Sequence, residues 1–222
     1  MARAVQQRSM LSRLALGSDP VRRAIYIVGV VPAVWYFYAG INNQLGADPL
    51  NVLERALGLW ALRLLVAGLA ITPLRRLGGP NLIRYRRAIG LLAFYYAALH
   101  LTTYLVLDQG LDLAAIWADI VKRPYITVGM LAFIVLVPLA VTSNGPSIRH
   151  LGARWNSLHR LVYVAAAAGA LHFIMLVKVW PLEPLLYAAL VAGLLLFRFH
   201  AYARKRWGPQ PAAKRGRTRS TG

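Results

Sequence analysis

The sequence has no cysteine among its 222 residues and few acidic side chains. Without thiols the chain forms no disulfide, has no thiolate nucleophile, and holds neither a cysteine-ligated iron–sulfur cluster nor a cysteine-held haem. It has only 7 acidic residues against 26 lysines and arginines, which gives a net charge of +19. The basic residues gather at the ends of apolar runs. That placement indicates contact with membrane lipid and not with nucleic acid.

The chain also lacks the short amphipathic stripes of a soluble domain. Hydrophobic residues make up 58% of it and charged residues 15%. The apolar residues form six runs, each close to the ~20 residues that cross a bilayer. These predicted spans are residues 24–41, 57–74, 88–107, 125–141, 158–177 and 185–199. The predicted fold class is therefore all-α, a polytopic membrane helix bundle with six transmembrane helices.

The loop charges predict how the bundle is oriented. Arginine and lysine crowd the loops on one side of the predicted spans, and nearly all the acids lie on the other. The positive-inside rule then places both termini in the cytoplasm. We expect a cytoplasmic N-terminal segment at residues 1–20, a transmembrane domain at 21–206 and a disordered basic cytoplasmic tail at 207–222. No glycine-rich nucleotide-binding fingerprint occurs between a strand and a helix.

Two histidines lie deep within separate predicted spans. His100 is about 18 Å, and His172 about 21 Å, from the cytoplasmic end of its span at 1.5 Å of rise per residue. Ionisable groups at such depth are rare and usually functional. Two neutral imidazoles on neighbouring helices are a common way to hold haem iron. The pair predicts a haem site past the membrane midplane, and the alternative is two unrelated buried histidines.

A third histidine, His159, begins the fifth predicted span on the cytoplasmic side. It is 13 residues, or about 20 Å, from His172, so the two cannot share one metal. The facing position on the third span is Arg86, with Arg87 beside it. Arginine is not an iron ligand. The alternatives are a second haem held by one histidine, a flavin phosphate bound by Arg84 with those two arginines, or an interfacial histidine without a cofactor.

Arg63 is a base within the second predicted span. It lies about 9 Å from the outer end of that span, at a depth similar to that of the histidine pair. A haem at this depth brings two propionates that need a cation in low dielectric. We therefore expect Arg63 to bind the propionates, and the alternative is that its side chain snorkels to the interface.

Short stretches across residues 25–200 carry a resemblance to a known family. They are Leu45-Gly46-Ala47-Asp48-Pro49, Ile71-Thr72-Pro73-Leu74, Leu82-Ile83-Arg84-Tyr85-Arg86-Arg87, Leu99-His100-Leu101-Thr102, Arg123-Pro124-Tyr125, Leu151-Gly152-Ala153-Arg154-Trp155, Leu158-His159-Arg160 and Pro184-Leu185-Leu186-Tyr187. Because these stretches follow one another in this order, the chain resembles MsrQ (YedZ). This is the family of membrane haem subunits of a periplasmic methionine sulfoxide reductase system. That family belongs to the ferric-reductase-like transmembrane group.

The resemblance implies a b-type haem electron carrier of the bacterial inner membrane that also binds FMN. One haem or two is implied, since His100, His159 and His172 match the family's haem-linked histidines. The implied donors are the quinone pool or a cytoplasmic flavin reductase, and the implied acceptor is the periplasmic molybdopterin reductase MsrP. Fuller members of the group have a fourth histidine, where this chain has arginine, and a cytoplasmic FAD/NADPH domain, which it lacks.

Two other functions stay open from the sequence. One is a haem-b carrier that serves another periplasmic acceptor, such as ferric iron. The other is a non-redox membrane protein, which would be colourless when purified. In each redox case the chain is an electron-transfer subunit, and the substrate chemistry belongs to its partner.

Overall fold

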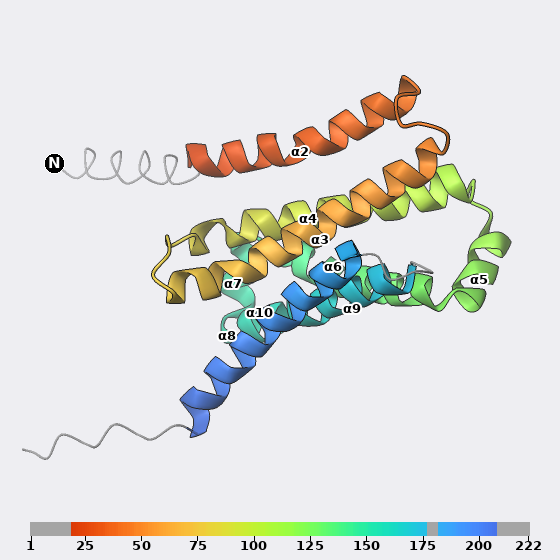
Figure 1. The fold of residues 1–222 in the computed structure, drawn as a ribbon. Coiled ribbons are helices and arrows are strands. Elements are labelled where there is room, and N and C mark those ends of the chain that lie inside the picture. The colour runs from red at the N-terminus through yellow and green to blue at the C-terminus, as the bar shows by residue number, and fades with distance from the viewer. Residues whose placement is uncertain (1–18, 177–181, 208–222) are drawn as a thin grey trace, which may run out of the picture.

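The computed structural model describes residues 19–176 and 182–207, which form helices joined by turns (Figure 1). Within those ranges, six helical segments are long and apolar enough to span a membrane: Pro20–Ile41, Pro49–Arg76, Ile83–Asp108, Pro124–Val141, Ala153–Leu176 and Leu182–His200. The predicted all-α bundle with six transmembrane helices is confirmed. The position of the termini in the cytoplasm stays a prediction. Most of the predicted segment 1–20, and the predicted tail after residue 207, lie outside the described residues.

Several of these helices begin at an aspartate–proline or arginine–proline step. The helices α2 (Pro20–Ile41), α3 (Pro49–Arg76) and α6 (Pro124–Val141) each have proline in the first turn. Proline fits there because the first backbone N–H groups of a helix have no partner within it. In α3 the Asp48 carboxylate accepts the backbone N–H of Asn51 at 3.2 Å. This N-cap fixes where the helix starts.

The helix α3 begins at Pro49, eight residues before the predicted start of the second span at residue 57. The polar side chains of Asn51, Glu54 and Arg55 fall in its first two turns. These polar residues make the segment resemble a loop in the sequence, although the cap at Asp48 already starts the helix. The extra turns matter because they carry residues of the site described below.

Three short helices in the loops were not predicted. They are α5 (Leu113–Lys122), α7 (Gly145–Leu151) and α8 (Ala153–Leu158). The turn between α7 and α8 is Gly152, whose φ of 52° is a conformation that favours glycine. Figure 1 shows α5 at one end of the bundle and the pair α7 and α8 at the other end.

Four helices enclose the centre of the bundle: α3, α4 (Arg86–Thr102), α6 and α9 (Val162–Leu176). The helix α2 packs outside them on α3 and α4, and α10 (Leu182–Trp207) packs on α9 and α3. The helices α4 and α9 run in the same direction, opposite to α3 and α6 (Figure 1). The two helices that carry the predicted histidine pair are therefore parallel, as the sequence required.

The ends of the bundle differ in charge. We call one end the acidic face, defined by Asp48, Glu54, Asp108, Asp112, Asp119 and Glu183, and the other the arginine face, defined by Arg75, Arg76, Arg84, Arg86, Arg87 and Arg149. Each central helix runs from one face to the other, as Figure 1 shows. The described residues thus reproduce the separation of charge on which the predicted orientation rests.

A tyrosine hydroxyl fastens α2 to the central helices. Pro32 lies inside the continuous helix α2, and the buried Tyr96 of α4 directs its hydroxyl to the backbone beside it. This hydroxyl accepts the N–H of Ala33 at 3.1 Å and donates to the carbonyl of Gly29 at 2.7 Å. A side chain inserted into the hydrogen-bond ladder is a known cause of helix bending. The Tyr96 hydroxyl thus joins α4 to the backbone of α2 through two hydrogen bonds.

Replacing Tyr96 with phenylalanine is expected to lower the free energy of unfolding by about 1 to 2 kcal/mol, because both backbone partners lose a bond. Thermal unfolding in detergent measures the change. Tyr38→Phe is the matched control, since its side chain lies on α2 and is 54% exposed. Equal melting temperatures for the two variants would show that the inserted hydroxyl contributes nothing.

Candidate functional site

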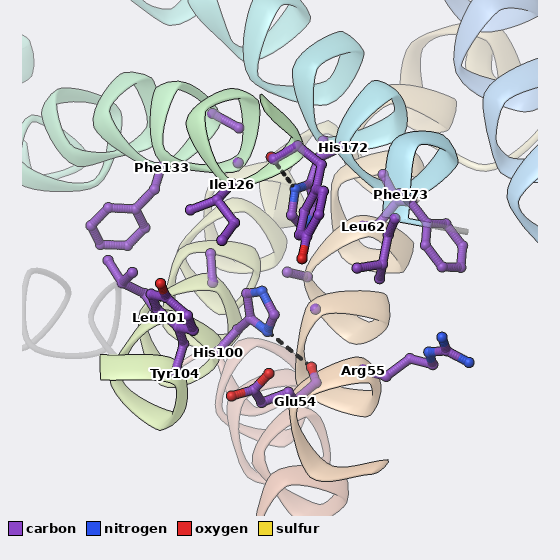
Figure 2. Close-up of a pocket in the computed structure, with 18 of the residues that line it drawn as sticks. Glu54, Arg55, Leu62, His100, Leu101, Tyr104, Ile126, Phe133, His172 and Phe173 are labelled. Atoms are coloured by element: carbon purple, nitrogen blue, oxygen red, sulfur yellow. Dashed lines mark hydrogen bonds between the residues drawn. The ribbon is translucent and has the colours of Figure 1, made fainter. Parts of the chain in front are cut away.

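The imidazole rings of His100 and His172 face each other at the centre of the bundle. His100 projects from α4 and His172 from α9, and the ring centroids are 6.2 Å apart with an interplanar angle of 71°. Figure 2 shows both rings in one pocket. The two histidines that residue counting places at the same depth are therefore neighbours in the structure.

Each of these rings is fixed by a backbone carbonyl of a neighbouring helix. The Nδ1 of His100 donates to the carbonyl oxygen of Glu54 at 2.9 Å, and the Nδ1 of His172 donates to that of Tyr125 at 2.7 Å. A carbonyl only accepts hydrogen bonds, so in both rings Nδ1 carries the proton. The lone pair of each Nε2 is then left for a ligand, the arrangement that metal-binding histidines require.

The rings border a cavity of about 420 Å³ between α3, α4, α6 and α9. Many side chains along its walls are small: Gly58, Ala61, Ala97, Gly129, Ala132, Ala165 and Gly169. Small residues on four facing helices leave room for a flat group, while larger apolar residues such as Leu62 and Phe133 close the sides. The cavity reaches the acidic face, where Asp48 and Asp108 line it.

The residues at this cavity fit a haem. Two metal–nitrogen bonds of about 2 Å each, plus the distance from each nitrogen to its ring centre, give a centroid separation near the one observed. Among residues 19–176 and 182–207, no group of three or more His, Asp or Glu side chains could hold a bare metal ion. Two imidazoles suit a metal whose other ligands belong to a cofactor, as in the iron of a haem. The buried Oε1 of Glu54, a residue that lines the same cavity, has no hydrogen-bond partner within the described chain.

Two arginines line the cavity, and Arg63 is not one of them. Arg55 and Arg123 lie near its opening on the acidic face. Arg123 pairs with Asp119 at 3.3 Å. For Arg55 the described part of the chain provides no ion pair or hydrogen bond, and its guanidinium extends away from the rings in Figure 2. Arg55 is therefore the available cation at the opening.

Arg63 instead joins α3 to α10. Its Nε donates to the hydroxyl of Tyr187 at 2.9 Å, and its guanidinium lies 3.6 Å from the Glu183 carboxylate and 5.3 Å from the Trp60 ring centre. The structure thus does not bring Arg63 to the histidine pair. The expected propionate contact of Arg63 stays a prediction, and the geometry favours Arg55 for that role.

His159 lies near the arginine face, apart from the other two histidines. Its Nε2 donates to the hydroxyl of Thr142 at 3.0 Å, and that hydroxyl donates in turn to the Pro138 carbonyl at 2.6 Å. The ring stacks on Trp155 with centroids 3.8 Å apart. Its charged neighbour is Arg86, as the sequence spacing predicts. In this arrangement Nε2 is already engaged, so the ring is held as a hydrogen-bond donor.

The arginine face has a further cation, whose hydrogen bonds the sequence pattern does not reveal. Arg198 of α10 donates to the Tyr163 hydroxyl at 2.7 Å and to the Leu69 carbonyl at 2.8 Å. The Leu69 carbonyl is free to accept because Pro73, four residues later, has no N–H. Arg86 and Arg87 lie half-buried in the first turn of α4. Arg86 is a charged neighbour of Arg198, so positive charge concentrates at this end of the central helices.

Sequence reasoning also missed the residues that support the histidine pair. Glu54 and Tyr125 act through their backbone carbonyls, which no side-chain pattern reveals. Gly58 and Gly129 lie against the two rings, and the signal that could have found them is a glycine inside an apolar helix. The remaining histidines, His150 and His200, are exposed.

The fold and the site together define a class of protein: a multi-pass membrane helix bundle with two facing imidazoles in its centre. Comparisons with known proteins give the same class. The family described as the ferric reductase like transmembrane component matches residues 57–170.

Individual relatives narrow the class. The protein-methionine-sulfoxide reductase heme-binding subunit MsrQ of Brucella anthropi is 61% identical over 184 residues, which is 82% of this chain and 84% of that protein. The proteins of the same name from Brucella ovis and Brucella canis are each 61% identical over 183 residues, or 82% of this chain and 83% of theirs. The chain therefore belongs to the MsrQ family.

Proposed function

We propose that the chain is the haem-b electron carrier of a methionine sulfoxide reductase system in the bacterial inner membrane. It accepts electrons from the quinone pool or a cytoplasmic flavin reductase. It delivers them to a periplasmic molybdopterin reductase, MsrP, which repairs oxidised proteins. The observation that carries this proposal is the pair of facing imidazoles, His100 and His172, each with its Nε2 lone pair free.

The histidine pair determines the kind of chemistry. His100 and His172 would hold a haem between their rings, and that group would supply one-electron transfer. Because both histidines would bind its iron, transfer to a partner would be favoured over binding of oxygen. The small residues of α3, α4, α6 and α9 shape the cavity, and the apolar side chains around it exclude water. The name of the curated relatives, a heme-binding subunit, supports this assignment.

The two faces of the bundle divide the roles of donor and acceptor. The histidine cavity opens to the acidic face, so the acceptor docks there. The arginine face, with Arg86, Arg87 and His159, is where a donor or a bound FMN phosphate would meet positive charge. By the positive-inside rule the arginine face is cytoplasmic and the acidic face periplasmic. Electrons thus move outward across the membrane.

The function is tested with the purified protein in lipid vesicles. The chemically reduced protein is expected to show a six-coordinate, low-spin haem spectrum and to be reoxidised by MsrP only when methionine sulfoxide is present. Stopped-flow absorbance follows the reoxidation. Ferric citrate replaces the reductase in a parallel reaction, and faster reoxidation by ferric iron would favour the ferric-reductase alternative.

The control variants are His100→Ala and His172→Ala. Each is expected to lose the low-spin spectrum, because the iron would lose one of its two protein ligands. If both variants kept that spectrum, the assignment of the pair would be wrong. A wild-type protein that binds no haem would support the non-redox alternative.

The roles of Arg55 and Arg63, which both lie on α3, are separable by their effect on the haem midpoint potential. Arg55→Gln is expected to lower it by on the order of 40 mV, equivalent to about 1 kcal/mol, because a cation near the propionates stabilises the reduced state. Arg63→Gln is the matched control on the same helix and should leave the potential unchanged. A larger shift of the midpoint potential in Arg63→Gln than in Arg55→Gln would support the propionate contact first predicted for Arg63. Redox titration measures both.

The ratio of haem and flavin to protein tests the second site. We expect one haem per chain, since Nε2 of His159 is engaged by Thr142. His159→Ala should keep that haem. It should lose FMN if the flavin binds at the arginine face. Pyridine haemochrome and flavin fluorescence assays give the ratios, and a fall from two haems to one in His159→Ala would instead show a second haem there.

A further inference from the structure

The two histidines are held in the same way although they lie on different helices. His100 donates to the carbonyl of Glu54, and a Cβ built at Gly58 would contact its ring. His172 donates to the carbonyl of Tyr125, and a Cβ built at Gly129 would contact its ring. In both cases the glycine follows the accepting carbonyl by four residues. The repetition of this arrangement indicates a requirement of the site.

The geometry of an α-helix explains the spacing of four residues. Residues at positions i and i+4 lie on the same face, one turn apart. The side chain at i+4 leans back towards the helix N-terminus, so it covers the turn that contains residue i. Any residue with a Cβ would therefore stand between the carbonyl of residue i and an approaching ring. Glycine at i+4 leaves the carbonyl of residue i open. The carbonyl oxygen has two lone pairs, and the one that the helix bond does not use accepts the histidine N–H.

The distances show that a side chain would be tolerated less well at one of the two glycines than at the other. A Cβ at Gly129 would lie 2.8 Å from Nδ1 and 3.0 Å from Cε1 of His172. A Cβ at Gly58 would lie 3.3 Å from both Nδ1 and Cε1 of His100. At Gly129 the ring has to move away from its carbonyl. At Gly58 the ring has to shift by only a few tenths of an ångström.

We propose that Gly58 and Gly129 are positioning residues for the two haem ligands: each leaves a helix carbonyl open so that the imidazole docks on it with Nε2 directed into the cavity. This inference rests on the proposed haem site. A methyl group at Gly129 would push the Nδ1–H of His172 away from its carbonyl, so the buried donor would lose its partner and Nε2 of the same ring would leave its place. A methyl group at Gly58 would shift the His100 ring by a few tenths of an ångström and lengthen the corresponding bond. Gly129 is the more stringent of the two.

The test compares alanine variants of four glycines by electron paramagnetic resonance of the ferric haem, which reports spin state and the relative orientation of the axial rings. Gly129→Ala is expected to lose low-spin signal and gain a high-spin fraction. Gly58→Ala should stay low-spin with shifted g values. Gly90→Ala, on the same helix as His100, is the control for the effect of alanine itself, because a Cβ there meets nothing within 4 Å.

A fourth variant separates ring displacement from the loss of cavity volume. Gly169 also lines the cavity, but a Cβ there meets only Leu62 Cδ1, at an ordinary 3.8 Å. We expect Gly169→Ala to take up cavity volume without displacing either ring, so any change in its g values should be smaller than that of Gly129→Ala. If Gly169→Ala or Gly90→Ala changed the spectrum as much as Gly129→Ala, the inference would be overturned. An unchanged spectrum in both Gly58→Ala and Gly129→Ala would overturn it as well.

The outcome stays informative if Gly129→Ala does not fold. Gly58→Ala, with its milder contact, then carries the test: shifted g values support the inference and parent values refute it. Failure of the underlying function gives a different result, because the parent protein itself would then show no low-spin haem signal.

Discussion

The site depends on two hydrogen bonds from imidazole to the backbone. In an apolar interior each ring N–H needs a partner, because an unsatisfied buried donor is costly. His100 and His172 meet that need with carbonyls of the helices opposite them. These bonds fix the tautomer, leave both Nε2 lone pairs free and set the direction of each ring. The small residues of the cavity contribute to a binding site only because the rings are held in this way. The same is true of the parallel course of α4 and α9.

The same bundle separates charge along its axis. The histidine cavity opens to the acidic face, while Arg86, Arg198 and His159 lie near the arginine face. His159 is held by Thr142 and stacked on Trp155, so it differs from the paired histidines in both partner and surroundings. This asymmetry is consistent with the proposed carrier, which has its histidine site near the acidic face and a cationic surface at the other end.

The sequence predicts some of these features well because rise per residue in a helix is constant. Residue counts give the six spans, the matched depth of His100 and His172, and Arg86 as the neighbour of His159. Rotation about the helix axis is harder to predict. Arg63 follows Gly58 by five residues, which places it about 140° around α3 and away from the rings. Backbone acceptors such as the Glu54 carbonyl leave no mark in the side-chain pattern.

The most direct test of the account is the near-infrared magnetic circular dichroism spectrum of the ferric, purified protein. The charge-transfer band of a low-spin ferric haem shifts with the identity of its two axial ligands. With both histidines as ligands, the spectrum is expected to show the band of bis-imidazole ligation, and this band should be lost in His100→Ala and in His172→Ala. A band typical of one histidine and another ligand, or of a high-spin haem, would contradict the central claim that these two rings share one iron.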